Sequence, residues 1–383
     1  MAAVASHQLA DCIICHVWNA DLSMVAICPN NNEVHIYKAS PARDSVWERV
    51  HILRQHDQLI SGIDWGTATN KIVTASHDRN SYVWSFEGDT WNPTLVILRL
   101  NRAAISVKWS PKENKFAVGS GAKVVCICYY ETENNWWVSK IIRKKHSSTV
   151  TSVSWHPNNV LLATTSTDSK CRVFSAYIKG VDSRGDANTS FGELKFGEQL
   201  FEVSDMFGWT FGVKWSPMGS TFAYVGHDST ICFVKVHGRT TTSQVITLQG
   251  LPLRDVLFLS ENRLVAGGFE CNPLLFLGDN KGTWKLSRCL DELKQTARDV
   301  KAGSQLSEAF GKLYGQSKHR TSLDGVESSK LHGNSHENCI TSFAPLPLGG
   351  KQSQHAFSTT GLDGKVVIWD LRSLNDAVAG LDI

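Results

Sequence analysis

Apolar and polar residues alternate along short segments that recur through most of the 383-residue chain. Alternation with a period of two is typical of strands, because successive side chains of a strand point to opposite faces. Between the second and third segments of the clearest unit lies Asp78, which can hydrogen-bond its own turn backbone. The pattern there predicts four short strands, at residues 59–65, 71–76, 80–86 and 94–100.

The unit returns seven times with one spacing. A strand ending near Trp or Phe is followed 12 or 13 residues later by a turn residue, usually Asp, and six residues later by an apolar or aromatic residue. The turn residues are Asn31, Asp78, Gly121, Asp168, Asp228, Glu270 and Asp363. Most intervals lie near the roughly 40–45 residues of a WD-type propeller blade. One four-stranded sheet cannot bury both faces, so we predict that the chain, 1–383, forms a single all-β, seven-bladed WD40 propeller.

The two ends of the chain are predicted to close this ring. The stretch Ala3–Leu9 precedes the first inner strand, while the last unit ends after its third strand. We therefore expect the N-terminal stretch to supply the missing outer strand of blade seven.

A His precedes the turn Asp in three units, as in WD repeats, where His, Ser or Thr, Asp and Trp form a hydrogen-bonded network within a blade. The candidate hydroxyls are Thr74 or Ser76 in blade two and Thr165 or Ser166 in blade four. A Ser-His-Asp triad uses similar residues, but an enzyme needs one such site, whereas a fold needs one for each blade. We interpret the set as structural: His56, Asp78, Trp84, His146, Asp168, His336, Asp363 and Trp369.

Composition and short motifs suggest no catalytic residue, cofactor or metal site. The net charge of +3 is too small to indicate a nucleic-acid-binding surface, and no apolar run is long enough to span a bilayer. We expect a cytoplasmic protein without a signal peptide. Cys12 and Cys15 have CxxC spacing without a matching second pair, and His332, His336 and Cys339 lack a fourth ligand. The pair Trp136-Trp137 is interpreted as outer-strand packing rather than as a binding platform.

Two long intervals interrupt the repeat. Residues 178–197 are predicted to form an extended polar loop in blade four, and residues 291–338 an insertion between blades six and seven. Within the insertion, a short amphipathic helix is predicted at about 304–315. Its apolar stripe contains Leu306, Phe310, Leu313 and Tyr314. Residues 281–330 hold ten Lys or Arg and six Asp or Glu, a basic excess larger than that of the whole chain. The alternative is a linker without a role of its own.

Several longer sequence segments identify a family more specifically than the blade spacing does. They include residues 15–19 (CHVWN), 27–37 (ICPNNNEVHIY), 78–84 (DRNSYVW), 93–104 (PTLVILRLNRAA), 114–121 (NKFAVGSG), 155–163 (WHPNNVLLA) and 171–179 (CRVFSAYIK). In these segments the chain resembles the family of propeller subunits (subunit 1) of the actin-related protein 2/3 complex. The resemblance runs from the first blade to Trp369 and departs mainly within 178–197 and 291–335.

The resemblance implies a non-catalytic scaffold in a seven-protein assembly that nucleates branched actin filaments of the cytoskeleton. Its expected partners are actin-related proteins, small helical subunits and nucleation-promoting factors. The insertion is expected to contact actin of the mother filament through Leu306, Phe310, Leu313 and Tyr314. The alternatives are a general propeller adaptor, such as a ubiquitin-ligase substrate receptor or a chromatin scaffold, and a propeller enzyme. An enzyme would need a cluster of acids, bases or metal ligands that does not repeat, whereas these polar residues recur from blade to blade.

Overall fold

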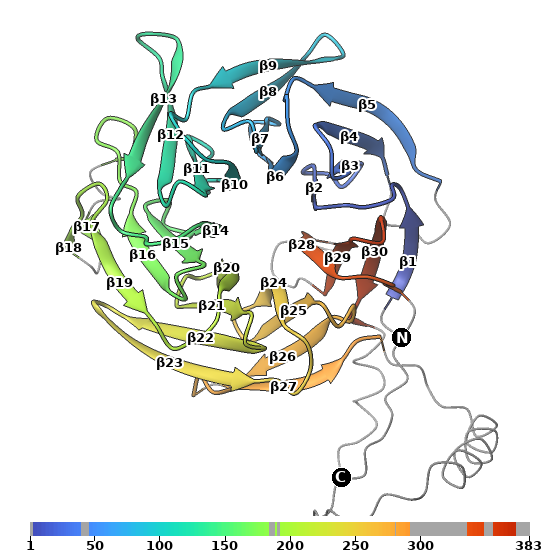
Figure 1. The fold of residues 1–383 in the computed structure, drawn as a ribbon, viewed down its shortest axis with the longest axis vertical. Coiled ribbons are helices and arrows are strands. Elements are labelled where there is room, and N and C mark those ends of the chain that lie inside the picture. Colours follow the sequence, from blue (N-terminus) through green and yellow to red (C-terminus); the bar gives the residue numbers. More distant parts are fainter. Residues whose placement is uncertain are drawn as a thin grey trace, which may run out of the picture.

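The fold is known from a computed structural model, which describes residues 3–39, 46–183, 188–189, 192–279, 281–291, 335–347 and 355–372. Within these residues, seven four-stranded antiparallel sheets stand side by side around a central axis (Figure 1). The predicted all-β, seven-bladed propeller is therefore confirmed. We call the strands of each blade a to d, from the ring centre outwards.

Blades one to three are continuous in sequence. Blade one contains β2 (Cys15–Trp18), β3 (Met24–Cys28), β4 (Glu33–Lys38) and β5 (Glu48–Arg54). Blade two contains β6 (Ile60–Trp65), β7 (Ile72–Ser76), β8 (Ser81–Glu87) and β9 (Thr90–Val96). Blade three contains β10 (Ala104–Trp109), β11 (Lys115–Ser120), β12 (Val125–Glu131) and β13 (Trp136–Ile142).

Blades four to six complete most of the circle. Blade four contains β14 (Val150–Trp155), β15 (Leu161–Ser166), β16 (Cys171–Ser175) and β19 (Gln199–Val203), with the small hairpin β17 (Asn188–Thr189) and β18 (Gly192–Glu193) inserted. Blade five contains β20 (Thr210–Trp215), β21 (Thr221–Gly226), β22 (Thr230–His237) and β23 (Thr240–Thr247). Blade six contains β24 (Leu253–Ser260), β25 (Arg263–Gly268), β26 (Leu274–Gly278) and β27 (Trp284–Cys289).

Blade seven joins the two ends of the ring. It contains β28 (Ile340–Leu346), β29 (Ala356–Gly361), β30 (Lys365–Asp370) and, as its outer strand, β1 (Ala3–Gln8). Strand β1 pairs antiparallel with β30, with Ser6 opposite Val367 and Gln8 opposite Lys365. The predicted closure by the N-terminal strand is confirmed, and β30 is thereby paired with a strand on both of its sides.

The hydrophobic core lies between neighbouring blades. Strand b of each blade is covered on both faces, so β7 and β15 are buried at every residue instead of alternating. The Trp that ends strand a reaches across this interface. Trp109 donates its indole N–H to Lys71 O of blade two at 3.2 Å, and Trp155 donates to Lys108 O of blade three at 3.0 Å. The recurring Trp therefore ties each of these blades to the one before it.

One predicted strand was misplaced. In blade two, strand d begins at Thr90 rather than at residue 94, because Gly88 and Asp89 adopt positive φ angles of 56° and 62° and make a tight hairpin. Pro93 therefore lies inside strand d, where the outer edge requires no further ladder donor.

The blade-four loop, predicted to be extended and polar, carries an acid that is buried against the blades. Asp182, within it, is buried and forms an ion pair with the fully buried Lys115 of β11. Lys115 Nζ also donates to Ala176 O at 3.0 Å. Asp182 accepts hydrogen bonds from Asn159 Nδ2 at 3.0 Å and from the Ile178 backbone N–H at 2.7 Å. The loop is thereby fastened to blades three and four.

The second interruption separates β27 from β28. Residues 292–334 lie outside the described residues, and so does the predicted helix at 304–315. Across the part of the chain that the structure describes, no helix has the length and apolar character needed to cross a membrane.

Candidate functional site: the blade networks and the base of the insertion

The loops that join strand d to the next strand a, and the turns that join b to c, lie on one face of the ring because neighbouring strands of a blade are antiparallel. We call this the d–a face. It carries every residue of the proposed networks that lies in a loop or turn, and both ends of the insertion.

The blade-two network is complete. His56 Nδ1 lies 2.6 Å from Asp78 Oδ2, and His56 Nε2 lies 2.8 Å from Thr74 Oγ1. Trp84 Nε1 donates to the same hydroxyl at 3.1 Å. Burial disfavours the charged form of Asp78, but hydrogen bonds from His56 and from the Asn80 backbone hold its pKa below its usual value. Of the two candidate hydroxyls, Thr74 rather than Ser76 is the partner of His56.

The blade-seven network has the same geometry. His336 Nδ1 lies 3.0 Å from Asp363 Oδ2, and Nε2 lies 2.7 Å from Thr359 Oγ1. Trp369 Nε1 donates to Thr359 Oγ1 at 2.7 Å. Despite burial, the hydrogen bond from His336 lowers the pKa of Asp363.

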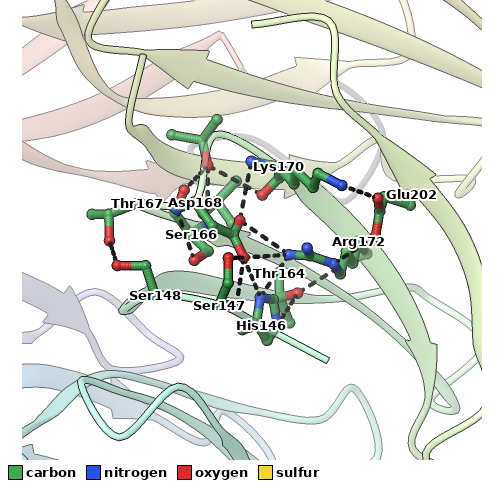
Figure 2. A network of polar contacts seen from close by, with 12 residues as sticks. His146, Ser147, Ser148, Thr164, Ser166, Thr167, Asp168, Lys170, Arg172 and Glu202 are labelled. Carbon is green, nitrogen blue, oxygen red and sulfur yellow. Dashed lines mark hydrogen bonds and ion pairs between the residues drawn. The ribbon is translucent and has the colours of Figure 1, made fainter. Parts of the chain in front are cut away.

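Blade four departs from this arrangement (Figure 2). His146 Nδ1 is 3.9 Å from Asp168 Oδ2, and Arg172 lies between them. Arg172 Nη1 is 2.9 Å from both His146 Nδ1 and Asp168 Oδ2, while its Nε is 2.9 Å from Glu202 Oε2. The expected hydroxyls were wrong, because Thr164 Oγ1, not Thr165 or Ser166, lies 3.2 Å from His146 Nε2.

The charge state of His146 follows from this geometry. Burial, together with the charge of Arg172, lowers the pKa of His146 to about 4, so the ring is neutral at pH 7. Because Arg172 can only donate, Nδ1 of His146 accepts and Nε2 carries the proton that goes to Thr164. Phe174 occupies the position of Trp84, so no indole N–H reaches this hydroxyl.

The turn acid has a second, more general role. It accepts a backbone N–H from the preceding d–a loop in five blades. The pairs are Asp78 with Asp57 N at 3.2 Å, Asp168 with Ser147 N at 2.9 Å, Asp228 with Phe207 N at 3.0 Å, Glu270 with Leu251 N at 2.6 Å and Asp363 with Glu337 N at 2.9 Å. This hydrogen bond between loop and turn recurs from blade to blade, and the Thr hydroxyls of the networks are fully buried. Both observations support a structural network rather than a nucleophilic triad.

The base of the insertion adjoins the blade-seven network. Asp291, just after β27, is buried, and its Oδ2 accepts the Ser335 backbone N–H at 2.9 Å. The Asp291 N–H in turn donates to Asn272 Oδ1 at 3.1 Å. Both ends of the insertion are thus held on the d–a face beside His336. The expected actin-contact residues, Leu306, Phe310, Leu313 and Tyr314, lie outside the described residues.

Four exposed apolar side chains on the d–a face of blades five and six were not anticipated. They are Phe207, Trp209, Leu251 and Phe269, of which Phe207 is 98% exposed. The available signal was two aromatic residues between strands, outside the alternating pattern. The two residues of the Trp136-Trp137 pair differ in burial. Trp137 is buried in the core, as predicted, whereas Trp136 is 47% exposed.

Motifs with possible redox or metal chemistry are not assembled into a site. All ten cysteines are free thiols. In the described ranges, no group of three His, Cys, Asp or Glu side chains could hold a metal ion. His332 lies outside those ranges, while His336 belongs to the blade-seven network.

The blades and their networks define a WD-repeat β-propeller. A family model described as WD domain, G-beta repeat, matches residues 47–85 and 138–175. Each match contains strand d of one blade and strands a to c of the next. The sequence repeat is therefore offset from the structural blade by one strand, which is why the N-terminal strand closes the ring.

Relatives match nearly the whole chain. Actin-related protein 2/3 complex subunit 1B of Arabidopsis thaliana is 59% identical over 375 residues, covering 98% of both chains. Subunit 1A-B of Xenopus laevis is 45% identical, covering 98% of this chain and 99% of the relative. Subunit 1 of Schizosaccharomyces pombe is 36% identical, covering 93% and 96%. The chain belongs to the family of actin-related protein 2/3 complex subunit 1.

Proposed function

We propose that this chain is the propeller subunit of an actin-related protein 2/3 complex and supports nucleation of branched actin filaments as a non-catalytic scaffold. The observation that carries the proposal is the 59% identity over 98% of both chains to a relative named as subunit 1 of that complex. It works in the cytoplasm, at the actin cytoskeleton. Its partners are the actin-related proteins, the small helical subunits and nucleation-promoting factors.

Recovery of partners tests this assignment. The tagged full chain, purified from its own cells, is expected to bring down actin-related proteins and small helical subunits in fixed proportion. Recovery with ubiquitin-ligase components or chromatin proteins instead would favour the adaptor alternative.

Within this function, the insertion contacts the actin of the mother filament. Support comes from its excess of Lys and Arg and from its apolar residues at helical spacing. The hydrogen bond between Ser335 and Asp291 also brings both ends of the insertion, between which lie 43 residues (292–334), to one point on the d–a face. A scaffold with a fixed base and a basic extension suits a partner with an acidic surface.

The double substitution F310D/L313D tests the contact. It places two charges on the apolar stripe, so we expect normal assembly of the complex and at least about tenfold fewer branches in an actin polymerisation assay. Gln316→Asp, which adds charge beside the stripe, is the matched control and should leave branching unchanged. Normal branching by an assembled F310D/L313D complex would contradict the contact, while failure of that variant to assemble would show a structural role instead.

A further inference from the structure

The inner strands of all seven blades surround a cavity of about 290 Å³ on the ring axis. This volume lies just below that of typical small-molecule sites, and it is many times larger than one water molecule requires. Its lining includes Lys108, Lys214, Arg254 and Asp255. The cavity is therefore a charged space rather than a continuation of the apolar core.

Comparison of equivalent strands shows how these charges are paired. The residue just before the final Trp of strand a is Asp64 in blade two and Lys108 in blade three. Asp64 Oδ1 lies 2.7 Å from Lys108 Nζ, while its Oδ2 accepts the Trp109 N–H at 2.8 Å. Burial opposes the charge of Lys108, but Asp64 offsets this and raises the pKa of the ammonium group. Lys108 is thus neutralised by the preceding blade.

Lys214 occupies the same position in blade five, but the preceding blade supplies Ser154 instead of an acid. Ser154 Oγ accepts the Trp215 N–H at 3.3 Å, so it replaces the backbone contact of Asp64 and not its charge. No described carboxylate forms an ion pair with Lys214. Desolvation lowers the pKa of Lys214; the attraction of Asp255 opposes this, and the repulsion of Lys108 adds to it.

Other groups around the cavity leave an excess of positive charge. Asp255, on the next blade, accepts the Phe343 N–H at 3.1 Å through Oδ2. It is the one carboxylate in the lining, which also holds Arg254, and its charge acts on Lys214. His16 is neutral, because burial lowers its pKa to about 3. The Ser106 hydroxyl, also in the lining, is buried with no partner among the described residues.

We propose that this axial cavity binds a small oxyanion of the phosphate class, held by Lys214 with the Ser106 hydroxyl as a further donor. The lining holds Lys214 and Arg254 besides the paired Lys108, and Asp255 is its one carboxylate, so one positive charge is left unbalanced in a partly desolvated space. A bound oxyanion balances that charge. Lysine is a compact point charge that suits phosphate oxygens. The size of the cavity limits the ligand to free phosphate or a small phosphate monoester.

Binding by the full chain tests the site, with inorganic phosphate and glycerol phosphate as separate probes. Phosphate should bind saturably in calorimetry and raise the unfolding temperature, because a ligand that binds the folded state stabilises it. Lys214→Met keeps the length of the side chain without its charge and should weaken binding by at least about tenfold. Lys285→Met, at an exposed lysine of β27, is the matched control and should bind as the unsubstituted chain does.

The remaining outcomes are also decisive. Without phosphate, K214M should unfold at the same or a higher temperature, since it removes a partly desolvated charge that belongs to no ion pair. Binding of both probes would assign the site to phosphate groups in general, and binding of phosphate alone to the free ion. Equal binding by K214M and K285M, or no saturable binding of either probe, would overturn the proposal. None of these results depends on assembly with other subunits.

Discussion

Blades two and four both connect the b–c turn to the preceding d–a loop, but they do so with different side chains. In both, an acid in the b–c turn accepts a backbone N–H from the d–a loop, at Asp78 and Asp168. In blade two, His56 and Trp84 converge on one Thr hydroxyl. In blade four, Arg172 enters between the His and the Asp, at the position where blade two has Tyr82. The hydrogen bond from the d–a loop to the turn acid is therefore the constant feature. The His, Thr and Trp network is one of several ways to position that acid.

Replacing Arg172 should give the largest difference in unfolding free energy between the two blades. Arg172→Met leaves Asp168 buried without its cation and frees the Nδ1 of His146. Removing one partner of a buried ion pair costs about 3–5 kcal/mol of unfolding free energy. The matched change in blade two, Tyr82→Met, removes no ion pair; it loses ring contacts with His56 and Trp84 and should cost about 1 kcal/mol. Chemical denaturation of the full chain measures both, and equal losses would refute the distinction.

The pH dependence that His146 of blade four contributes is the next largest effect. With a folded pKa of about 4 against an ordinary value of 6.5, His146 is neutral in the folded chain where the unfolded chain binds a proton. Stability should therefore fall as the pH drops from 6.5 to 4, by roughly 3 kcal/mol from this residue.

His146→Gln isolates this contribution, because Gln does not titrate. The variant should show a smaller fall across the same pH interval, even though the other titrating groups remain. Parallel curves for H146Q and the unsubstituted chain would show that His146 does not have its lowered pKa.

Removal of the Thr hydroxyls should give the smallest difference in unfolding free energy between the two blades. Thr74 joins both His56 and Trp84, whereas Thr164 contacts one ring, His146. Thr74→Val should therefore cost about 2 kcal/mol and Thr164→Val about 1 kcal/mol. Urea unfolding of the two variants provides the measurement. A larger loss for T164V would mean that the blade-two network is not the more cooperative one.

The sequence was a good guide wherever one residue type recurs at one spacing. It predicted seven blades, closure by the N-terminal strand, and the pairing of His56 with Asp78 and of His336 with Asp363. It failed at Arg172, because a single charged residue in a strand gives no sign of the side chain it will contact. Asp182 was missed for the same reason, since its partner Lys115 is 67 positions away. The strand d boundary in blade two depended on a hairpin that Gly88 and Asp89 define only through their backbone angles.

The candidate functional residues divide in a similar way. The insertion and its apolar stripe are visible in sequence as an interruption of a regular spacing. Their base, between Asp291 and Ser335, depends on a contact across 44 positions. The axial cavity was not predicted, because its lining residues come from different repeats and each has an ordinary place in its own strand.

The sequence by itself determined the number of blades, the offset between repeat and blade, and the family to which the chain belongs. These depend on local alternation and fixed spacing, which any stretch of about 40 residues carries within itself. Only the tertiary structure decided which charges are paired. Asp64 forms an ion pair with Lys108, whereas Ser154 at the equivalent position gives Lys214 no such pair, because ring closure sets each inner strand beside the next. Electrostatic pairing depends on distance in space, and that distance is fixed only when the seven blades meet.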